Sequence, residues 1–461
     1  MPNDIVRKSL PSSPVPALVR LTDEDAPFWL LHQALGWSVV QQMLWVFPGH
    51  VAEESLREFN DALAQGRLHR RLVDARVPGA RPYWVRPSQS VPPAFDVERI
   101  DDAGISDWAV TELRDVELDP YAGRCWRIRA GVTTSGRTVL SLCTLHLVAD
   151  GRARIDAVRD ALRGTAFGAP TNAAEEHPAT ASTWADVYDA ARQVAAAGLG
   201  VTRALRQSVR RDVDPTAVDP RPPRSPLAER APTATPVWAT ASVAVEDWDR
   251  TAERHGGTAN SLFIAVVAGL LRVAGYTSPD NPVKVGVPVA DRTGEDDMRG
   301  NAVAGVTVYL TPVPSPATDL GRVRNVCRDA YTRLAEGRRP ALTHLRPLAW
   351  LVPPSRIAGK GAPDAGYPDA VASNVGQLPP ELLTIGGLTA DDVTVRGHAQ
   401  GVVADDRHRY GEGVQAWLTR TEGHTTFTVS GFDETHFVDD ETFGALLSRE
   451  LTEWGLAHRI W

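Results

Sequence analysis

The sequence predicts an α/β fold of two halves, and three observations support this prediction. Apolar runs typical of strands alternate with amphipathic helical segments along the whole chain. A chain of 461 residues is long enough for two domains, each with its own core. Seven prolines between residues 212 and 236 exclude a regular helix or a paired strand there. We therefore expect an N-terminal half over 1–211, a proline-rich linker over 212–236 and a C-terminal half over 237–461.

The composition excludes several classes of protein. Hydrophobic residues make up 43% and charged residues 23%, as in an ordinary globular protein. The formal net charge of -8 argues against a general nucleic-acid binder, whose surface would be basic. There is no signal-peptide pattern and no apolar run of about 20 residues that would span a bilayer. The three cysteines are widely spaced, without a metal-binding or disulfide pattern. We therefore expect a cytoplasmic protein with no metal site.

The elements of the N-terminal half follow from apolar periodicity and from capping residues. A helix is expected to start around residues 22–27, where polar residues and acids precede Pro27, and to end near Gly36. Residues 91–121 are rich in acids and are expected to form a solvated surface. The expected strands are 37–47, 82–85, 124–132 and 139–146, and the further expected helices are 52–64, the segment that follows the turn 148–151, and 184–197.

The C-terminal half repeats this alternation of strands and helices. Thr258 and the residues after it are expected to cap a strongly apolar helix over 262–274. The expected strands are 237–245, 282–289, 301–310, 370–375, 414–421 and 425–432, and the other expected helices are 247–255, 320–334 and 440–454. This order predicts a second α/β half.

The chain is organised around residues 137–164, where a strand ends in a histidine. His146 closes the strand, Asp150 and Gly151 lie in the turn, and a helix follows. An imidazole titrates near neutrality and can take a proton from a nucleophile. Asp150 would hold the turn in shape, and Gly151 would bring backbone N–H groups to a helix start, where negative charge is favoured. A core histidine bonded to a carbonyl, followed by an ordinary Asp-Gly turn, is the alternative interpretation.

An ordered set of motifs resembles the CoA-dependent acyltransferase superfamily. This superfamily includes chloramphenicol acetyltransferase, plant HxxxD acyltransferases, peptide-synthetase condensation domains and wax ester synthase/diacylglycerol acyltransferases. Residues 145–151, LHLVADG, resemble its HHxxxDG motif. Other segments resemble the family's GxTxND, P-V-x-x-R…G-N and SNxPGP segments, namely GGTANS at 256–261, PVADR at 288–292 with RGN at 299–301, and SNVG at 373–376. Their order is most similar to the wax ester synthase group.

The resemblance implies two chloramphenicol acetyltransferase-like subdomains that form a pseudo-dimer, with an active-site tunnel between them. It implies that His146 is the general base that deprotonates an acceptor hydroxyl or amine for attack on a thioester. Asp150 would support the loop through a salt bridge to Arg292, and the backbone N–H of Gly151 is a candidate oxyanion donor.

Three further residues match polar positions near the family's tunnel and are expected to bind substrate, namely Asn260, Ser373 and Asn374. A helix N-cap is the alternative role for Asn260, and a turn is the alternative for Asn374. The chain departs from the family pattern at Leu145, which replaces the first histidine, and at Ser261, which replaces an aspartate. Pro-Gly-Pro is also missing after the SN pair. These departures leave the chemistry intact but weaken the case for wax ester or triacylglycerol substrates.

The resemblance also implies cofactors and partners. No permanently bound cofactor is expected, and acyl-CoA or a phosphopantetheine thioester would be the co-substrate. The expected partners are a small-molecule acyl donor and acceptor, an acyl-carrier protein as another donor, and a membrane surface for peripheral contact, although no basic amphipathic helix in the sequence requires one. The predicted function is acyl transfer to a hydroxyl or an amine. A stand-alone condensation enzyme with carrier-bound substrates and a catalytically silent docking module are the alternatives.

Overall fold

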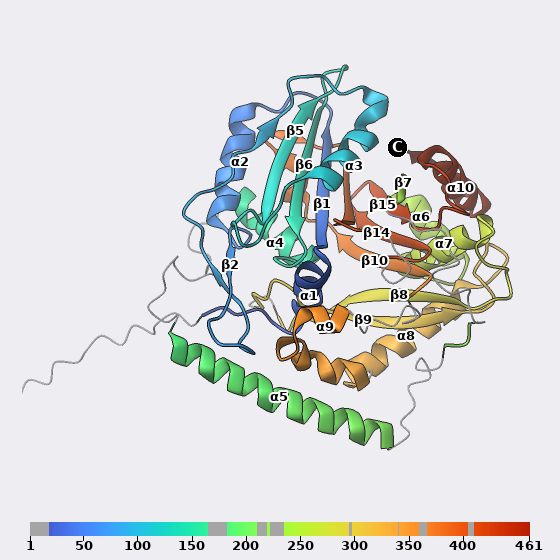
Figure 1. Cartoon of the computed structure of the whole chain (residues 1–461). Helices are drawn as coiled ribbons and strands as arrows, with labels where there is room; N and C mark the ends of the chain where they lie inside the picture. The colour runs from blue at the N-terminus through green and yellow to red at the C-terminus, as the bar shows by residue number, and fades with distance from the viewer. Residues whose placement is uncertain are drawn as a thin grey trace, which may run out of the picture.

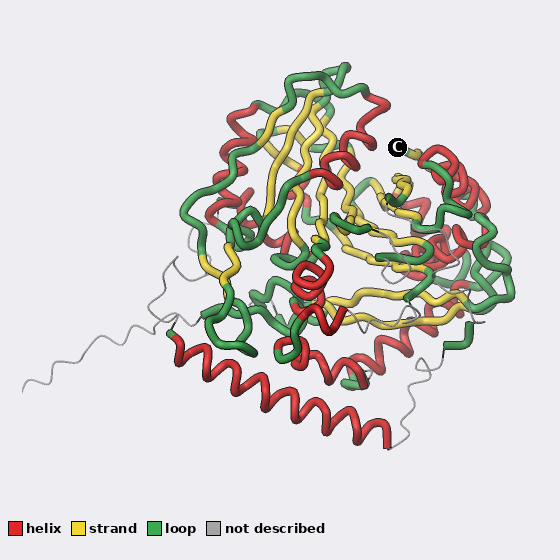
Figure 2. Tube along the Cα trace, viewed as in Figure 1, coloured by secondary structure: helices red, strands yellow, loops and turns green. Residues whose placement is uncertain are grey.

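The computed structural model describes residues 18–164, 182–209, 219–221, 235–294, 297–339, 341–358, 367–403 and 410–461. Its helices and strands are arranged around two main sheets, as the α/β prediction requires (Figure 1, Figure 2). Most of the predicted linker lies outside the described residues, so its boundaries stay a prediction.

The first main sheet has five strands in the order β13-β1-β6-β5-β4. Neighbouring strands are antiparallel except β4 and β5, which are parallel. A separate hairpin pairs β2 with β3. The strands are β1 (Ser38–Phe47), β2 (Arg71–Val73), β3 (Tyr83–Val85), β4 (Ala94–Phe95), β5 (Trp126–Val132) and β6 (Thr138–Leu145), and the helices are α1 (Ala26–Leu35), α2 (Glu53–Gln65), α3 (Ile105–Asp115) and α4 (Gly151–Leu162).

The second main sheet has seven strands in the order β16-β7-β15-β14-β10-β8-β9. All pairs are antiparallel except those of β10 with β8 and β14. Its strands are β7 (Val237–Ala244), β8 (Val283–Ala290), β9 (Val303–Leu310), β10 (Ala370–Gln377), β14 (Val414–Arg420), β15 (His424–Gly431) and β16 (His458–Ile460). The helices of this half are α6 (Val245–Arg254), α7 (Ala259–Val273), α8 (Leu320–Ala335), α9 (Pro354–Ala358) and α10 (Asp440–Glu453), and η3 (Ala341–Trp350) is a 3₁₀ helix. Between β10 and β13 lie η4 (Pro380–Leu383) and the small hairpin of β11 (Thr384–Ile385) with β12 (Leu388–Thr389).

One strand crosses between the halves. β13 (Asp392–Gln400) comes from the C-terminal half of the chain, yet it pairs antiparallel with β1 along its full length, from Ser38 with Gln400 to Val46 with Asp392. No pattern that we identify in the sequence predicts this strand. Its exchange into the first sheet ties the two halves together and brings Val395 and Gly397 to the space between them.

Each half has its own apolar core. In the N-terminal half, buried side chains of β1, β6, α2 and α4 form one cluster. In the C-terminal half, α7 is the central helix, and every residue from Ser261 to Leu271 is buried. Thr258 caps α7 by accepting a hydrogen bond from the Ser261 N–H, while the Ser261 side chain accepts one from the Thr258 N–H. The polar start therefore fixes where an otherwise apolar helix begins.

The expectation of a solvated surface over residues 91–121 is wrong. This segment contains α3, whose Ala109 and Leu113 are buried against the first sheet. Glu112 is buried too, and it accepts a hydrogen bond from Arg129 at 2.9 Å. The many acidic residues obscure the helical pattern of the sequence, because one of them, Glu112, points toward a partner inside the protein and not toward water.

Helix α5 (Thr183–Val209) runs along the outside of the molecule (Figure 1). Its inward side carries Asp186 and Asp189, which pair with Arg20 and Arg81. Gly200 lies so close to η3 that a Cβ atom would come within 2.0 Å of a backbone carbonyl oxygen. The side of α5 that faces the protein therefore carries Asp186, Asp189 and Gly200, whereas large apolar residues such as Trp184 and Leu205 are exposed. Among the described helices, no single one is long and apolar enough to cross a membrane, and only α6 and α7 together, bent by 86°, meet the same criteria.

Candidate active site

A cavity of about 500 Å³ lies between the two halves. Both main sheets contribute to its wall, as do the start of α4 and the start of α1. The lining residues from the N-terminal half include Phe28, Val39, Gln41, His146, Gly151 and Arg154, and those from the C-terminal half include Val287, Val303, Ser373, Val375, Val395 and Trp417. The cavity is thus mostly apolar with a few polar groups, which is typical of a site for a small organic molecule.

His146 lies at this cavity, directly after the last residue of β6. Its backbone N–H donates to the carbonyl of Val39 at 2.8 Å, which holds it to the neighbouring strand. Its ring stacks on the ring of Phe28, with the centroids 3.9 Å apart and the planes 17° apart. Burial lowers the pKa of His146, so its imidazole is neutral at pH 7.

Asn301 fixes the tautomer of that imidazole. The side-chain N–H₂ group of Asn301 donates to three oxygen atoms, the carboxylate of Asp25 and the carbonyls of His146 and Leu147. Its Oδ1 is therefore the acceptor at 3.0 Å from His146 Nδ1. Nδ1 must carry the proton, which leaves the lone pair on Nε2. A neutral ring with a free Nε2 lone pair is the form that can accept a proton.

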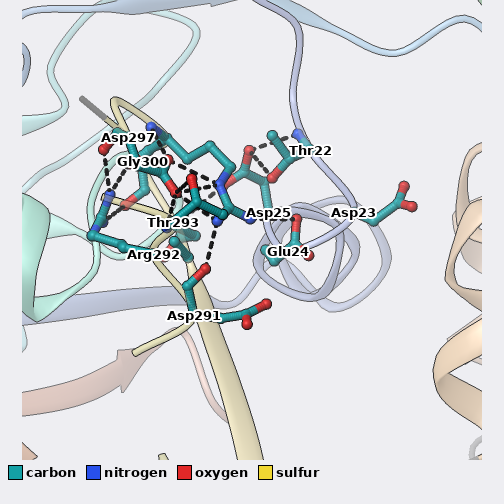
Figure 3. A network of polar contacts seen from close by, with 12 residues as sticks. Thr22, Asp23, Glu24, Asp25, Asp291, Arg292, Thr293, Asp297 and Gly300 are labelled. Atoms are coloured by element: carbon teal, nitrogen blue, oxygen red, sulfur yellow. Dashed lines mark hydrogen bonds and ion pairs between the residues drawn. The ribbon is translucent and has the colours of Figure 1, made fainter. Parts of the chain in front are cut away.

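Asp25 supports Asn301 from the start of α1. Its Oδ1 accepts from Asn301 Nδ2 at 2.8 Å, and its Oδ2 accepts from the backbone N–H and the hydroxyl of Thr22 at 2.7 and 3.0 Å. Burial raises the pKa of Asp25 to about 6. Figure 3 shows Asp25 and Thr22 in the same polar network as the loop after β8. A chain of hydrogen bonds thus connects α1 with the histidine.

Asp150 and Arg292 meet across the boundary between the halves. Arg292 Nη2 donates to Asp150 Oδ1 at 2.7 Å, and Arg292 Nη1 donates to the carbonyls of Asp297 and Arg299. Asp150 also caps α4 by accepting from the Ala153 N–H, and its Oδ2 accepts from the Ala302 N–H. Its carboxylate is therefore fully used in holding the turn, and it lies in the position that the sequence analysis gives to a supporting group.

Two glycines stand at the turn and at the loop opposite it, and one of them, Gly300, allows the two segments to approach closely. Gly151 is the first residue of α4 and lines the cavity, and the first N–H groups of a helix have no partner inside the helix. Gly300 packs against the turn from the other half, where a Cβ atom would come within 2.4 Å of the Val148 carbonyl oxygen. Its carbonyl accepts from the Asp150 N–H at 2.9 Å. A side chain at 300 would push the loop that carries Asn301 away from His146.

Of the three residues expected to bind substrate, Ser373 lines the cavity and the two asparagines do not. Asn374 donates to Asn260 Oδ1 at 2.9 Å, and Asn260 donates to the hydroxyl of Tyr331 at 3.3 Å. The alternative role of Asn260 as an N-cap is wrong, because Thr258 caps α7. Asn374 Oδ1 accepts from the Gly376 N–H, but the residue lies within β10 beside an irregularity in the strand pairing, so its alternative role in a turn is wrong.

Asp25 and Asn301 belong to the site but are not among the residues predicted for it. Asn301 stands in the RGN segment at 299–301, which was a usable signal, but Asp25 looks like an ordinary residue at a helix start. In the described part of the chain, no group of three or more His, Cys, Asp or Glu residues could hold a metal ion.

Neither a family model nor a curated protein matches this sequence. Solved structures do match it over nearly the whole chain. A wax ester synthase/diacylglycerol acyltransferase from Marinobacter aquaeolei VT8 is 18% identical with a TM-score of 0.56, over 94% of this chain and 98% of that one. The first condensation domain of the calcium-dependent antibiotic synthetase, in complex with a substrate analogue, is 18% identical with a TM-score of 0.57, over 95% and 96%.

Polyketide synthase associated protein 5 from Mycobacterium tuberculosis is 14% identical with a TM-score of 0.55, over 95% of this chain and 98% of that one. Together these matches confirm the fold that the motifs predict. The chain has the fold of the CoA-dependent acyltransferase superfamily, with two chloramphenicol acetyltransferase-like subdomains. Condensation domains and wax ester synthase/diacylglycerol acyltransferases share this fold with it.

Proposed function

We propose that this protein is an acyltransferase that moves an acyl group from a thioester donor to a hydroxyl or amine acceptor. The observation that carries the proposal is His146, a neutral imidazole at a cavity between two subdomains, with Nδ1 bound to Asn301. This arrangement leaves Nε2 as a base, and Nε2 has no hydrogen-bond partner among the residues that the structure describes. A base that is neutral at the working pH and already oriented is what general-base catalysis requires.

In the proposed reaction, His146 Nε2 takes the proton of the acceptor hydroxyl or amine as its oxygen or nitrogen attacks the thioester carbonyl carbon. The new C–O or C–N bond gives a tetrahedral intermediate whose negative oxygen accepts a hydrogen bond from the Gly151 N–H. When the C–S bond breaks, the leaving thiolate takes the proton from the imidazolium. Asp150 and Arg292 take no proton in these steps and hold the turn in place.

The first experiment is a screen of the purified protein. Acyl-CoA esters of several chain lengths are mixed with alcohols and amines, and products are read by mass spectrometry against a matched His146→Ala blank. The proposal expects products that form with the wild type and not with the blank. Absence of any product with CoA donors and with carrier-protein donors contradicts it.

The same screen separates the alternative functions. Amide or ester formation from acyl-carrier protein, without turnover of the CoA ester, would favour a stand-alone condensation enzyme. Binding of a carrier protein without turnover of any donor would favour a silent docking module. The presence of His146, Asp150 and Arg292 in one connected arrangement favours an enzyme over the docking module.

We propose in addition that α5 binds an anionic membrane surface, on the cytoplasmic side where we expect the protein. No basic amphipathic helix is apparent from the sequence alone, but the exposed side of α5 combines large apolar side chains with arginines. Its outward side is apolar, and Trp184 has 81% of its surface exposed. The other exposed large apolar residues of α5 are Val187, Tyr188, Val194, Leu199, Val201 and Leu205. The charged residues on the exposed side of the described part of α5 are arginines, namely Arg192, Arg203 and Arg206. Apolar side chains with flanking cations complement a surface of anionic lipids.

Cosedimentation with vesicles tests this proposal. Wild-type protein should bind phosphatidylserine-containing vesicles more than pure phosphatidylcholine vesicles, and binding should weaken with salt. The double variant Trp184→Ser/Leu205→Ser should lose it, whereas Val438→Ser, at an exposed apolar residue outside α5, should not. Equal vesicle binding by the two variants contradicts the proposal. The proposal is also contradicted if the wild type binds no vesicles and instead self-associates in a way that the double variant abolishes.

A further inference from the structure

Arg154 is a buried cation at the wall of the cavity that the proposed mechanism does not use. It lies on the first turn of α4, three residues after Gly151, and its surface is fully buried. None of its three guanidinium nitrogen atoms has a hydrogen-bond partner among the described residues. A buried charge without hydrogen-bond partners is strongly destabilising, so folded proteins usually provide partners for such a group.

Burial lowers the pKa of Arg154 and the charge of Asp150 acts to raise it, but Asp150 makes no hydrogen bond to the guanidinium group. Asp150 accepts hydrogen bonds from Arg292, from the Ala153 N–H and from the Ala302 N–H, so both of its oxygens are occupied by other donors. Arg154 therefore differs from Arg292, which has carboxylate and carbonyl partners. It also differs from Arg396, another buried arginine, which bonds to Thr240 and is not among the residues that line the cavity.

A second buried polar group at the same cavity also lacks a partner. Gln41 lies on β1 and lines the cavity, and its Oε1 has no hydrogen-bond partner among the described residues. Arg154 offers donors and a positive charge, while Gln41 offers an acceptor. A ligand with an anionic group and a neighbouring N–H or O–H group would satisfy both.

We infer that the cavity takes a substrate that carries a carboxylate, and that Arg154 recognises this carboxylate. The inference rests on the proposed function, because the bound molecule is a substrate only if the protein is an acyltransferase. Binding of the carboxylate itself does not depend on turnover. The carboxylate belongs either to the acceptor, as in a hydroxy acid or an amino acid, or to the acyl group, as in a monothioester of a dicarboxylic acid. A bidentate guanidinium–carboxylate pair in a site of low dielectric constant would discriminate strongly against an uncharged analogue.

The binding test compares an acid with its amide. Hexanoate and hexanamide are titrated calorimetrically into the wild type, Arg154→Met and Arg154→Lys. The wild type should bind hexanoate at least tenfold more tightly than hexanamide, Arg154→Lys should keep part of this preference, and Arg154→Met should bind the two within threefold. Equal affinities in the wild type, or an unchanged preference in Arg154→Met, overturn the inference. The wild-type comparison decides the matter even if Arg154→Met does not fold.

The melting temperature separates a binding role of Arg154 from a structural one. Without ligand, Arg154→Met should melt at or above the wild-type temperature, because an apolar side chain replaces an unpaired buried charge. A markedly lower melting temperature would assign Arg154 to the core.

Transfer assays then locate the carboxylate, with succinyl-CoA against butyryl-CoA for the acyl group and 3-hydroxybutyrate against 3-hydroxybutyramide for the acceptor. An acid preference in binding without any turnover would contradict the proposed function and leave this inference intact.

Discussion

Arg292 Nη2 donates to Asp150 Oδ1 at 2.7 Å, although 142 residues separate the two side chains. The contact joins the turn after β6 to the loop after β8, and both side chains are almost fully removed from water. The position of His146 therefore depends on the docking of the two halves, since the same loop carries Asn301.

Replacement of Arg292 by methionine should lower the free energy of unfolding by about 3 kcal/mol, because Asp150 would keep a buried negative charge without its cationic partner. Urea unfolding measures this change. The matched control is Arg250→Ala, which removes an exposed ion pair with Asp247 and should cost less than about 1 kcal/mol. Similar losses in the two variants would show that the Asp150 contact does not hold the halves together.

Asn301→Ala should reduce kcat about 10-fold to 100-fold with little change in KM, because the ring of His146 loses the acceptor that fixes its tautomer. The ¹⁵N chemical shifts of His146 provide an independent measurement. In the wild type at pH 7, Nδ1 should be protonated and Nε2 should not, and the variant should show a mixture of tautomers. Gln33→Ala, at an exposed amide on α1, serves as the control. A wild-type ring protonated on Nε2 alone would refute this role of Asn301.

The acidic limb of the pH profile should lie below pH 6.5. Burial lowers the pKa of His146, and the base is active when it is neutral, so kcat should rise with pH through this lowered pKa. Initial rates between pH 4.5 and 8 check the position of the limb. A limb above pH 6.5 would mean that the imidazole is stabilised as a cation.

The raised pKa of Asp25 predicts that the free energy of unfolding also depends on pH. Burial raises its pKa from 3.8 to about 6, so the folded state holds this proton more tightly than the unfolded state. Stability from this group is present at low pH and is lost as the pH rises through about 6. Relative to Asp25→Asn, the wild type should therefore lose about 2 kcal/mol of unfolding free energy between pH 4.5 and 7.5. If the unfolding free energies of the wild type and of Asp25→Asn change equally between pH 4.5 and 7.5, this prediction is wrong.

Much of the fold could be predicted from the sequence because local patterns encode it. The capped start of α7, the strand that ends before His146 and the glycine turns are visible as short-range signals. The exchange of β13 was not predicted, because its pairing with β1 is a long-range choice that no local pattern records. Helix α3 was missed because its buried Glu112 resembles a surface acid.

The site was predictable only in part, for the same reason. His146, Asp150 and Arg292 stand in motifs, and the structure brings them together. The support from Asp25 depends on a contact between residues that are 276 positions apart, and nothing near Asp25 in the sequence indicates it. Asn260 and Asn374 match a motif, but their side chains bond to each other outside the cavity lining.

The proposed function depends above all on His146 as the base. The most direct measurement is the rate of acyl transfer at pH 7 by the wild type and by His146→Ala, with circular dichroism and melting temperature to establish that the variant is folded. We predict a loss of at least about 100-fold in kcat for the folded variant. Turnover near the wild-type rate in folded His146→Ala protein would contradict the account.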